Sequence, residues 1–273
     1  MRLAVMADIH GNVAAFEAAL DHAASQNVDR IVLAGDIING APDSYKCWQM
    51  AKSLGCPILR GNHERYVAHF DTPQAHPIWK TEQFAPLHWT VAQFTGEERQ
   101  EIADLPLQLR LEDAPDILLV HASARNDNDT IMAHTPDAEI ASMFEGVTEK
   151  YIVRAHNHVG RVHLWDNRFI ISNGSVGWAL DGYTTAQYLV MEQRRDGWKI
   201  TQHSVPYDVE STLRRFEQTS YLEETGPIGY LFMREVATAS LQVNPFLRAY
   251  HRWSAQGVIS LQEALALFMA RGY

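Results

Sequence analysis

The chain opens with LAVMADIHG at residues 3–11, an apolar run that gives way at once to polar residues. The same order recurs in IVLAGD at residues 31–36 and in PILRGNHE at residues 57–64. Helical patterns over Val13–Ala24 and Ser44–Leu54 separate the three runs. Polar residues that follow such strands gather at one edge of a sheet. The βαβαβ series predicts a largely parallel sheet, covered by helices on both faces, with strands at Leu3–Ala7, Ile31–Ala34 and Pro57–Leu59.

The strand pattern resumes after residue 107 and predicts a second sheet. A helix is expected between two of its strands, from Thr135 through Phe144, with Pro136 at its first helical position. Two sheets face to face with helices outside make an α/β protein, a four-layer α/β/β/α sandwich. The later strands are predicted at Gln108–Glu112, Ile117–Val120, Tyr151–Arg154, Arg161–Trp165, Phe169–Ser172, Ala186–Glu192 and Gly197–Val205.

Two segments lie outside this pattern. Residues 72–106 are rich in aromatic residues and proline and predict an irregular or helical insertion near the polar edge, with a Thr95–Glu98 capping box before a short helix. We therefore divide the chain into a main domain, residues 1–205, and a helical extension, residues 206–273. The extension is either a cap on the main domain or an oligomerisation element. Its predicted helices are Asp208–Gln218, Tyr230–Ser240, Pro245–Trp253 and Ser260–Arg271.

Composition limits the classes of protein to which the chain can belong. With 273 residues, 46% of them hydrophobic, it can bury a full core. A formal net charge of −10 and the lack of a basic run argue against binding to a nucleic-acid duplex. Cys47 and Cys56 are too few for a disulfide framework, and neither a signal peptide nor a membrane-spanning run is evident. We expect a cytoplasmic protein with no membrane partner, and composition leaves a homo-oligomer open.

Metal-binding side chains stand directly after the predicted strands. The motifs, in chain order, are Asp8-Ile9-His10, Gly35-Asp36, Gly61-Asn62-His63-Glu64, His121 and His156-Asn157-His158. Taken alone, an Asp-x-His or Gly-Asp pair is usually a turn or a helix cap. Together the motifs supply carboxylate, imidazole and amide donors for two cations about 3.5–4 Å apart. Such donors suit two divalent metal ions, with Mn, Fe, Zn and Ni as the candidates.

The motif series resembles the calcineurin-like metallophosphoesterase superfamily, and the resemblance extends over residues 1–205. The segment Asn173-Gly174-Ser175-Val176-Gly177 resembles the small bacterial phosphodiesterase branch of that superfamily. Family members usually carry glycine where this chain has Ala122 and Ala155, a difference that bears on the size of the substrate. The resemblance implies that Asp8, His10, Asp36 and His158 bind one metal, that Asp36, Asn62, His121 and His156 bind the other, and that Asp36 bridges the two.

The same resemblance assigns catalysis to His63, which follows a ligand but is not itself one. His63 would stabilise the transition state or protonate the leaving oxygen, while a hydroxide bridging the metals attacks phosphorus. Arg60 and Arg125 flank two of the motifs and could clamp a phosphate oxygen, although a surface or helix-packing role is the commoner one for arginine. Glu64 would either orient His63 or start a helix.

These features predict a dinuclear metal-dependent phosphoesterase, with a phosphodiesterase acting on a small phosphorylated molecule or nucleotide as the favoured form. A phosphomonoesterase or nucleotide phosphatase with the same site is the alternative within the enzyme class. A non-catalytic binding scaffold of the same fold is the alternative outside it, but the complete ligand set and His63 argue against a scaffold. A protein phosphatase is disfavoured because Gly35-Asp36 continues as Ile37-Ile38-Asn39-Gly40, without the arginine typical of those relatives.

Overall fold

The computed structural model describes residues 1–257 and 259–271, and its strands form two sheets. The first sheet has the order β2-β1-β8-β9, and the second has the order β3-β4-β5-β7-β6. The strands are β1 (Arg2–Met6), β2 (Arg30–Leu33), β3 (Gln108–Leu111), β4 (Ala114–Val120), β5 (Tyr151–Arg154), β6 (Gly160–Trp165), β7 (Arg168–Asn173), β8 (Thr185–Arg194) and β9 (Gly197–Pro206).

Strand pairing in the first sheet departs from the βαβαβ expectation. Strand β1 pairs with β2 in parallel but with β8 antiparallel, and β8 and β9 form an antiparallel hairpin. The prediction of a largely parallel sheet with helices on both faces is therefore wrong, because β8 returns from the second sheet to pair with β1. The predicted strand Pro57–Leu59 is also wrong. In the described chain this segment makes one isolated bridge, Leu33 with Ile58, and Pro57 has no N–H to extend it.

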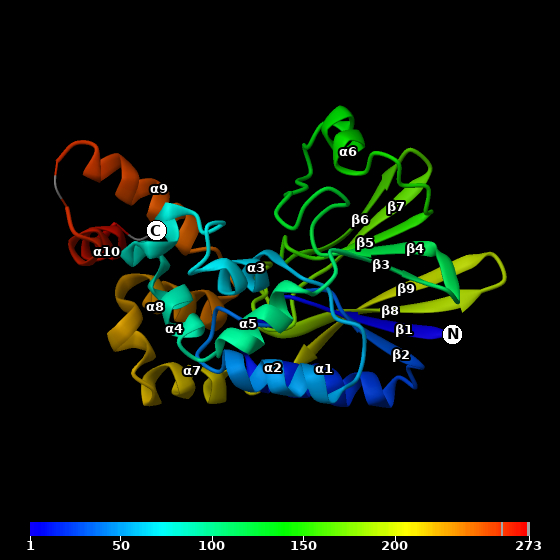
Figure 1. Cartoon of the computed structure of the whole chain (residues 1–273), viewed down its shortest axis with the longest axis horizontal. Helices are drawn as coiled ribbons and strands as arrows, with labels where there is room; N and C mark the ends of the chain where they lie inside the picture. The colour runs from blue at the N-terminus through cyan, green and yellow to red at the C-terminus, as the bar shows by residue number, and fades with distance from the viewer. Residues whose placement is uncertain (258, 272–273) are drawn as a thin grey trace.

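Helices and sheets stack in four layers (Figure 1). Helices α1 (Val13–Ser25) and α2 (Ser44–Ser53) cover the outer face of the first sheet, where Phe16 and Trp48 pack near Met6. The remaining layers confirm the predicted α/β/β/α sandwich.

The inner core follows from the alternation of side chains along β1. Leu3 and Val5 point away from α1 and join Val153 and Ile171 of the second sheet in one hydrophobic cluster. Helix α6 (Asp137–Met143) packs on the outer face of the second sheet. Pro136 is the N-cap of α6, so the first helical residue is Asp137, one position after the predicted Pro136.

The insertion is largely helical. Thr95 and Glu98 form the predicted capping box at the start of its last helix. Helix α3 precedes the insertion and begins at Asn62, within the third ligand motif. These helices are α3 (Asn62–His69), η1 (Pro77–Lys80), η2 (Glu82–Phe84), α4 (Ala85–Val91) and α5 (Gly96–Ala103).

The extension consists of α7 (Val209–Gln218), α8 (Tyr221–Thr238), α9 (Val243–Ser254) and α10 (Leu261–Ala270). Helix α8 begins well before the predicted Tyr230. The pair Gly226-Pro227, which usually ends a helix, is here a kink with φ of 56° at Gly226. Val258, Gly272 and Tyr273 belong to the predicted extension but lie outside the described residues.

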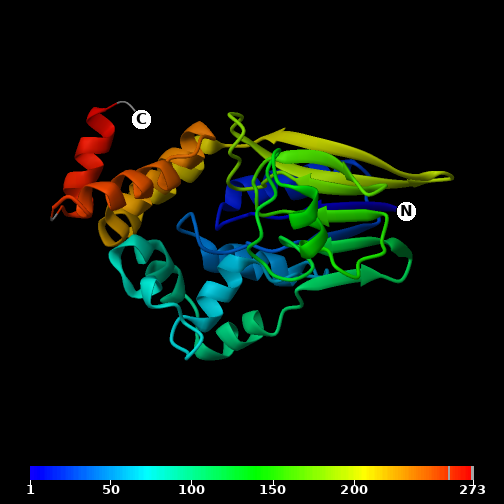
Figure 2. The ribbon, with the colours of Figure 1, turned by 90° about the horizontal axis from the view of Figure 1, so that it is seen from above.

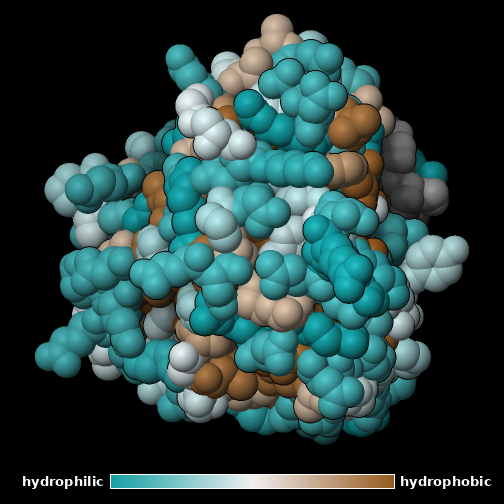
Figure 3. All heavy atoms as spheres, turned by 90° about the vertical axis from the view of Figure 1, so that its right-hand side faces the viewer, coloured by the Kyte–Doolittle hydropathy of each residue, from teal (hydrophilic) through white to brown (hydrophobic). Residues whose placement is uncertain are grey.

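The insertion and the extension lie at the same end of the molecule, away from the N-terminus (Figure 2). Trp89 of α4 meets Tyr221 of α8 edge to face, with ring centroids 5.5 Å apart. The opposite end, where the β8–β9 hairpin turn lies, presents a mainly hydrophilic surface (Figure 3). Among the helices of the described chain, none is long and apolar enough to cross a membrane.

Candidate metal centre

The backbone turns sharply at the candidate ligands. Asp8, His10, Asp36, His156 and His158 all have left-handed φ values, between 52° and 70°. For a residue other than glycine this conformation costs on the order of 1 kcal/mol, and such strain is concentrated at functional sites. Because each turn follows a strand end, it directs the side chains of Asp8 and His10, or of His156 and His158, toward one region rather than to opposite faces of a sheet.

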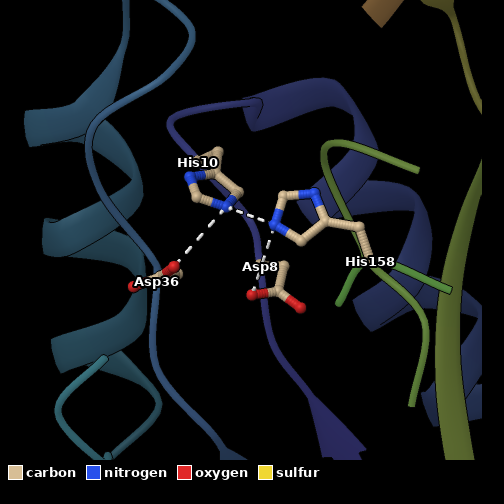
Figure 4. Close-up of side chains that lie close together, drawn as sticks. All are labelled: Asp8, His10, Asp36 and His158. Carbon is tan, nitrogen blue, oxygen red and sulfur yellow. Dashed lines mark hydrogen bonds and ion pairs between the residues drawn. The ribbon is translucent and has the colours of Figure 1, made fainter. Parts of the chain in front are cut away.

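A first group joins Asp8, His10, Asp36 and His158, whose ligand atoms all lie within 4.8 Å of one another. Figure 4 shows their side chains converging from three separate segments. The Nε2 atoms of His10 and His158 are 3.1 Å apart. His10 Nε2 lies 3.8 Å from an Asp36 oxygen, and His158 Nε2 lies 3.7 Å from Asp8 Oδ1.

A second group joins Asp36, His121 and His156, again within 4.8 Å. His121 Nε2 is 3.2 Å from Asp36 Oδ2. The Oδ1 atom of Asn62 stands between the two imidazoles, 3.2 Å from His121 Nε2 and 2.9 Å from His156 Nδ1. Asp36 is thus common to both groups, in the position of a bridging ligand.

The first group fits a cation on chemical grounds. His10 Nδ1 is 2.8 Å from the carbonyl of Asn39, and His158 Nδ1 is 2.7 Å from the carbonyl of Trp178. Each Nδ1 therefore carries the ring proton, which leaves two Nε2 lone pairs facing each other. Asp8 Oδ1 is buried and has no hydrogen-bond partner within the described chain. A divalent metal ion placed between these atoms would accept their unpaired lone pairs.

Burial and charge set the protonation of the imidazoles. Burial lowers the pKa of His156 to about 3 and that of His158 to about 4, so both rings are neutral at pH 7 and able to bind a metal. At His121 burial lowers the pKa, but the charge and hydrogen bond of Asp36, with the charge of Asp8 and the carbonyl of Ala34, together outweigh burial and raise the pKa to about 10. A cation beside Asp36 would displace the proton that His121 otherwise holds.

His63 lies beside both groups without belonging to either. Its Nε2 is 4.0 Å from Asp36 Oδ2, and its side chain is 19% exposed where that of Asp36 is 1% exposed. The amide nitrogen of Asn39 donates to His63 Nδ1 at 2.8 Å, so the ring proton is on Nε2. Thr90 of the insertion donates to the amide oxygen of Asn39 at 3.3 Å. Burial lowers the pKa of His63, which favours the neutral ring.

Glu64 supports the backbone that carries Asp36. Its carboxylate accepts from the N–H groups of Asp36 at 2.7 Å, Ile37 at 2.8 Å and Gly61 at 2.9 Å, and it forms the capping box of α3. Of its two predicted roles, the structure therefore shows the start of a helix. Gly61 has no alternative, since a Cβ there would lie 2.2 Å from Asp36 Oδ1.

The structure does not bring Arg60 and Arg125 together with the ligands. Arg60 donates to the carbonyl of Ala103 in the insertion. Arg125 forms an ion pair with Asp129 and donates to Ser142, on the side of the second sheet that α6 covers. Their role in substrate binding stays a prediction.

Arg154 is a buried charged residue that the sequence motifs did not predict as part of the site. It is 0% exposed at the end of β5, donates to the carbonyls of Ala122 at 2.6 Å and Asp129 at 2.7 Å, and also donates to the side chain of Asn157. It therefore ties the loop after His121 to the loop that carries His156. A single arginine ending an apolar strand, YIVR, was the available signal.

A four-layer sandwich with carboxylates and imidazoles gathered at the carboxyl ends of its strands defines the class of metal-dependent phosphoesterases. The family model for calcineurin-like phosphoesterases matches residues 1–160, and the chain belongs to this family. The two alanines that stand in place of the family's usual glycines are buried, and Ala155 packs in the core between the sheets.

Relatives match this chain over different shares of its length. An uncharacterized protein of Methanocaldococcus jannaschii is 22% identical over 82% of this chain and 95% of its own length. A symmetrical bis(5'-nucleosyl)-tetraphosphatase of Chromohalobacter salexigens is 30% identical over 42% of each chain. Solved structures of a metallophosphoesterase from Sphaerobacter thermophilus (23% identity, TM-score 0.68) and a hypothetical protein from Pyrococcus horikoshii (18%, 0.71) each cover 88% of this chain and 99% of their own. At these identities the two structures establish the fold alone.

Proposed function

We propose that the protein is a dinuclear metal-dependent phosphodiesterase that acts on a small phosphorylated molecule or nucleotide. The observation that carries the proposal is the convergence of imidazoles and buried carboxylates on two groups with Asp36 in common. When bound, two divalent cations would lower the pKa of a water molecule and neutralise charge on the phosphoryl oxygens. The first cation would be held by Asp8, His10, Asp36 and His158, and the second by Asp36, Asn62, His121 and His156.

His63 would act on the substrate rather than on the metals. Its Nε2–H lies at the more exposed rim of the shared carboxylate, within reach of a phosphoryl group bound there. A neutral ring donates a hydrogen bond without giving up its proton, which suits stabilisation of negative charge in the transition state. Asn39 holds the ring in this tautomer, and Thr90 orients Asn39.

A substrate panel assayed with defined metals tests the proposal. Metal-free protein would be loaded with Mn, Ni, Fe, Zn or Mg and assayed on phosphomonoesters, cyclic nucleotides, dinucleotides and p-nitrophenyl diesters. The Chromohalobacter relative supports adding dinucleoside tetraphosphates to the panel. Hydrolysis of a diester that chelator abolishes and metal restores is the expected result.

The other outcomes separate the alternatives. Faster hydrolysis of monoesters would replace the diesterase with a phosphomonoesterase of the same site. Two bound metals without hydrolysis of any ester would favour a binding scaffold, and protein that binds no metal would contradict the proposal altogether. His203→Ala, which changes a histidine on the outer face of the first sheet, serves as a control for His63→Ala.

A further inference from the structure

Trp178 contacts two of the candidate ligands directly. Its carbonyl oxygen lies 2.7 Å from His158 Nδ1 and sets the orientation of that ring. Its indole lies edge to face with His10, with ring centroids 4.8 Å apart, and its centroid is 5.7 Å from that of His158. With 6% of its surface exposed, Trp178 is a buried wall of the first group.

The backbone of Trp178 reaches a third ligand through one hydroxyl. Ser175 Oγ accepts from the N–H of Trp178 at 2.8 Å and donates to the carbonyl of Asp8 at 2.8 Å. Asp8, His10 and His158 are therefore all linked to Trp178, directly or through Ser175. The fourth member of the first group, Asp36, is the one shared with the second group.

The other side of the indole is covered by the extension. Phe232 of α8 packs against it with ring centroids 4.5 Å apart. Both belong to a cluster with Phe216, Tyr221 and Val236 of α7 and α8.

A buried carboxyl group stands beside the same indole. Glu235 of α8 is 2% exposed and accepts from the N–H groups of Gln242 at 2.6 Å and Val243 at 2.7 Å, at the start of α9. The indole N–H of Trp178 is buried and has no well-aligned hydrogen bond to a described residue. The carboxyl group that acts on it is that of Glu235, whose pKa is raised by burial and lowered in part by the indole N–H. Trp178 therefore meets two residues of one helix.

The second group is held from within the main domain. His121 Nδ1 bonds to the carbonyl of Ala34 at 2.8 Å, and His156 Nε2 lies 3.4 Å from the hydroxyl of Thr130. Arg154 fixes the loop of His156 through Asn157. These supports come from the sheets and their loops.

We propose that Trp178 is a positioning residue through which helix α8 sets the geometry of the first group, so that the extension controls the affinity for one metal ion more than for the other. This inference rests on the proposed function, because it requires two bound cations. Residues that orient metal ligands typically change metal affinity 10–100-fold when they are altered. A change in α8 should therefore act mainly on one of the two sites.

The test measures binding of Mn²⁺ to the metal-free, full-length protein by calorimetry, with electron paramagnetic resonance to detect magnetic coupling between two bound ions. In Phe232→Ala, we expect affinity at the first site to fall about 10-fold or more and the coupling signal to weaken, while the second site keeps its affinity. His10→Ala and His156→Ala, which each remove a donor from one group, assign the two binding steps. Phe232→Leu retains most of the bulk and should lose less at the same site.

Tyr250→Ala is the matched control, since Tyr250 is a partly buried aromatic residue of α9 that stacks on Phe246. It should leave both affinities unchanged. The inference is overturned if Phe232→Ala and Phe232→Leu bind both ions as the unaltered protein does, if both sites weaken equally, or if Tyr250→Ala has the same effect. Unaltered protein that binds no Mn²⁺ would instead contradict the proposed function, so the two failures are distinguishable.

Discussion

The two groups share Asp36 but rest on different parts of the molecule. The second group is oriented by Ala34 and Arg154, which lie within the residues that match the family model. The first group depends on Trp178 and, beyond it, on α8, which both lie after the end of that match at residue 160. The candidate donors therefore lie within the residues that match the family model, whereas part of what orients the first group lies outside them.

This difference gives the two sites different sensitivities. Changes in the sheets and loops of the main domain should act on the second site, and changes in the extension should act on the first. A change at Asp36 or His63 lies between the two and tests the centre as a whole.

Asp36→Asn should have the largest effect, because it weakens both sites together. Loss of several kcal/mol of charge stabilisation lowers kcat/KM by on the order of 10⁴-fold, and the metal content should fall below two ions per chain. Metal analysis and steady-state kinetics measure the two effects. Asp113→Asn, a conservative change at an exposed ion pair with Arg30, is the control and should behave as the unaltered protein. Unchanged turnover in Asp36→Asn would refute a shared bridging ligand.

His63→Ala should lower the rate by about 10²–10⁴-fold while both metals stay bound. Because Asn39 and burial favour a neutral ring, we expect similar losses for substrates with good and with poor leaving groups. A comparison of p-nitrophenyl and alkyl diesters measures this. A loss confined to the alkyl esters would show instead that His63 protonates the leaving oxygen.

Arg154→Met should be the mirror image of Phe232→Ala. Methionine keeps an unbranched apolar stem but removes the hydrogen bonds to Ala122, Asp129 and Asn157. The second site should therefore lose about 10–100-fold in Mn²⁺ affinity, and the first should lose less. Mn²⁺ titration measures the affinity of both sites. Thermal denaturation measures the loss of stability caused by the carbonyls that are left unpaired. Arg194→Met, at an exposed strand end, is the control. A loss confined to the first site would break the comparison between the two groups.

Glu235→Gln should have the smallest effect, on the pH dependence of stability. Burial raises the pKa of Glu235 from 4.5 to about 7. The folded state therefore binds this proton more tightly than the unfolded state does, which contributes stability that is complete below about pH 4.5 and is lost as pH rises through about 7. The difference amounts to about 3 kcal/mol at most.

Glutamine cannot ionise and lacks this loss. We therefore expect the difference in Tm between Glu235→Gln and the unaltered protein to increase by about 5–10 °C in favour of the variant as pH rises from 5 to 8. Both proteins are measured without metal. Glu217→Gln, an exposed change on α7, should show no such trend. A constant difference in Tm across this range would mean that Glu235 does not carry a raised pKa.

Local patterns in the sequence predicted the parts of the fold that local chemistry determines. The apolar run Leu3–Ala7 and the helical pattern Val13–Ala24 lie close to β1 and α1, and each ligand motif follows a strand end or the short bridged segment at Ile58. The antiparallel pairing of β1 with β8 was not predictable in this way, because no local feature of either strand selects a partner so distant along the chain. The predicted helix at Tyr230 likewise missed the first part of α8, which lies before the kink at Gly226.

The candidate site divides in the same manner. Its donors carry their chemistry in their residue type and could be read from their order in the sequence. Trp178 and Arg154 act through a carbonyl oxygen, a ring edge or a buried guanidinium, and nothing in their residue type distinguishes them from core residues. Only the folded chain shows what they touch.

The left-handed turns at five candidate ligands have a consequence for protein engineering. Without metal they are a cost, because the strained backbone remains and the buried Oδ1 of Asp8 has no partner among the described residues. Bound ions stabilise the folded state in proportion to the logarithm of their concentration over Kd. A screen for heat resistance in chelating buffer would therefore enrich sequences that have relaxed these turns and abandoned the chemistry, whereas the same screen with metal present would reward the strained sequence.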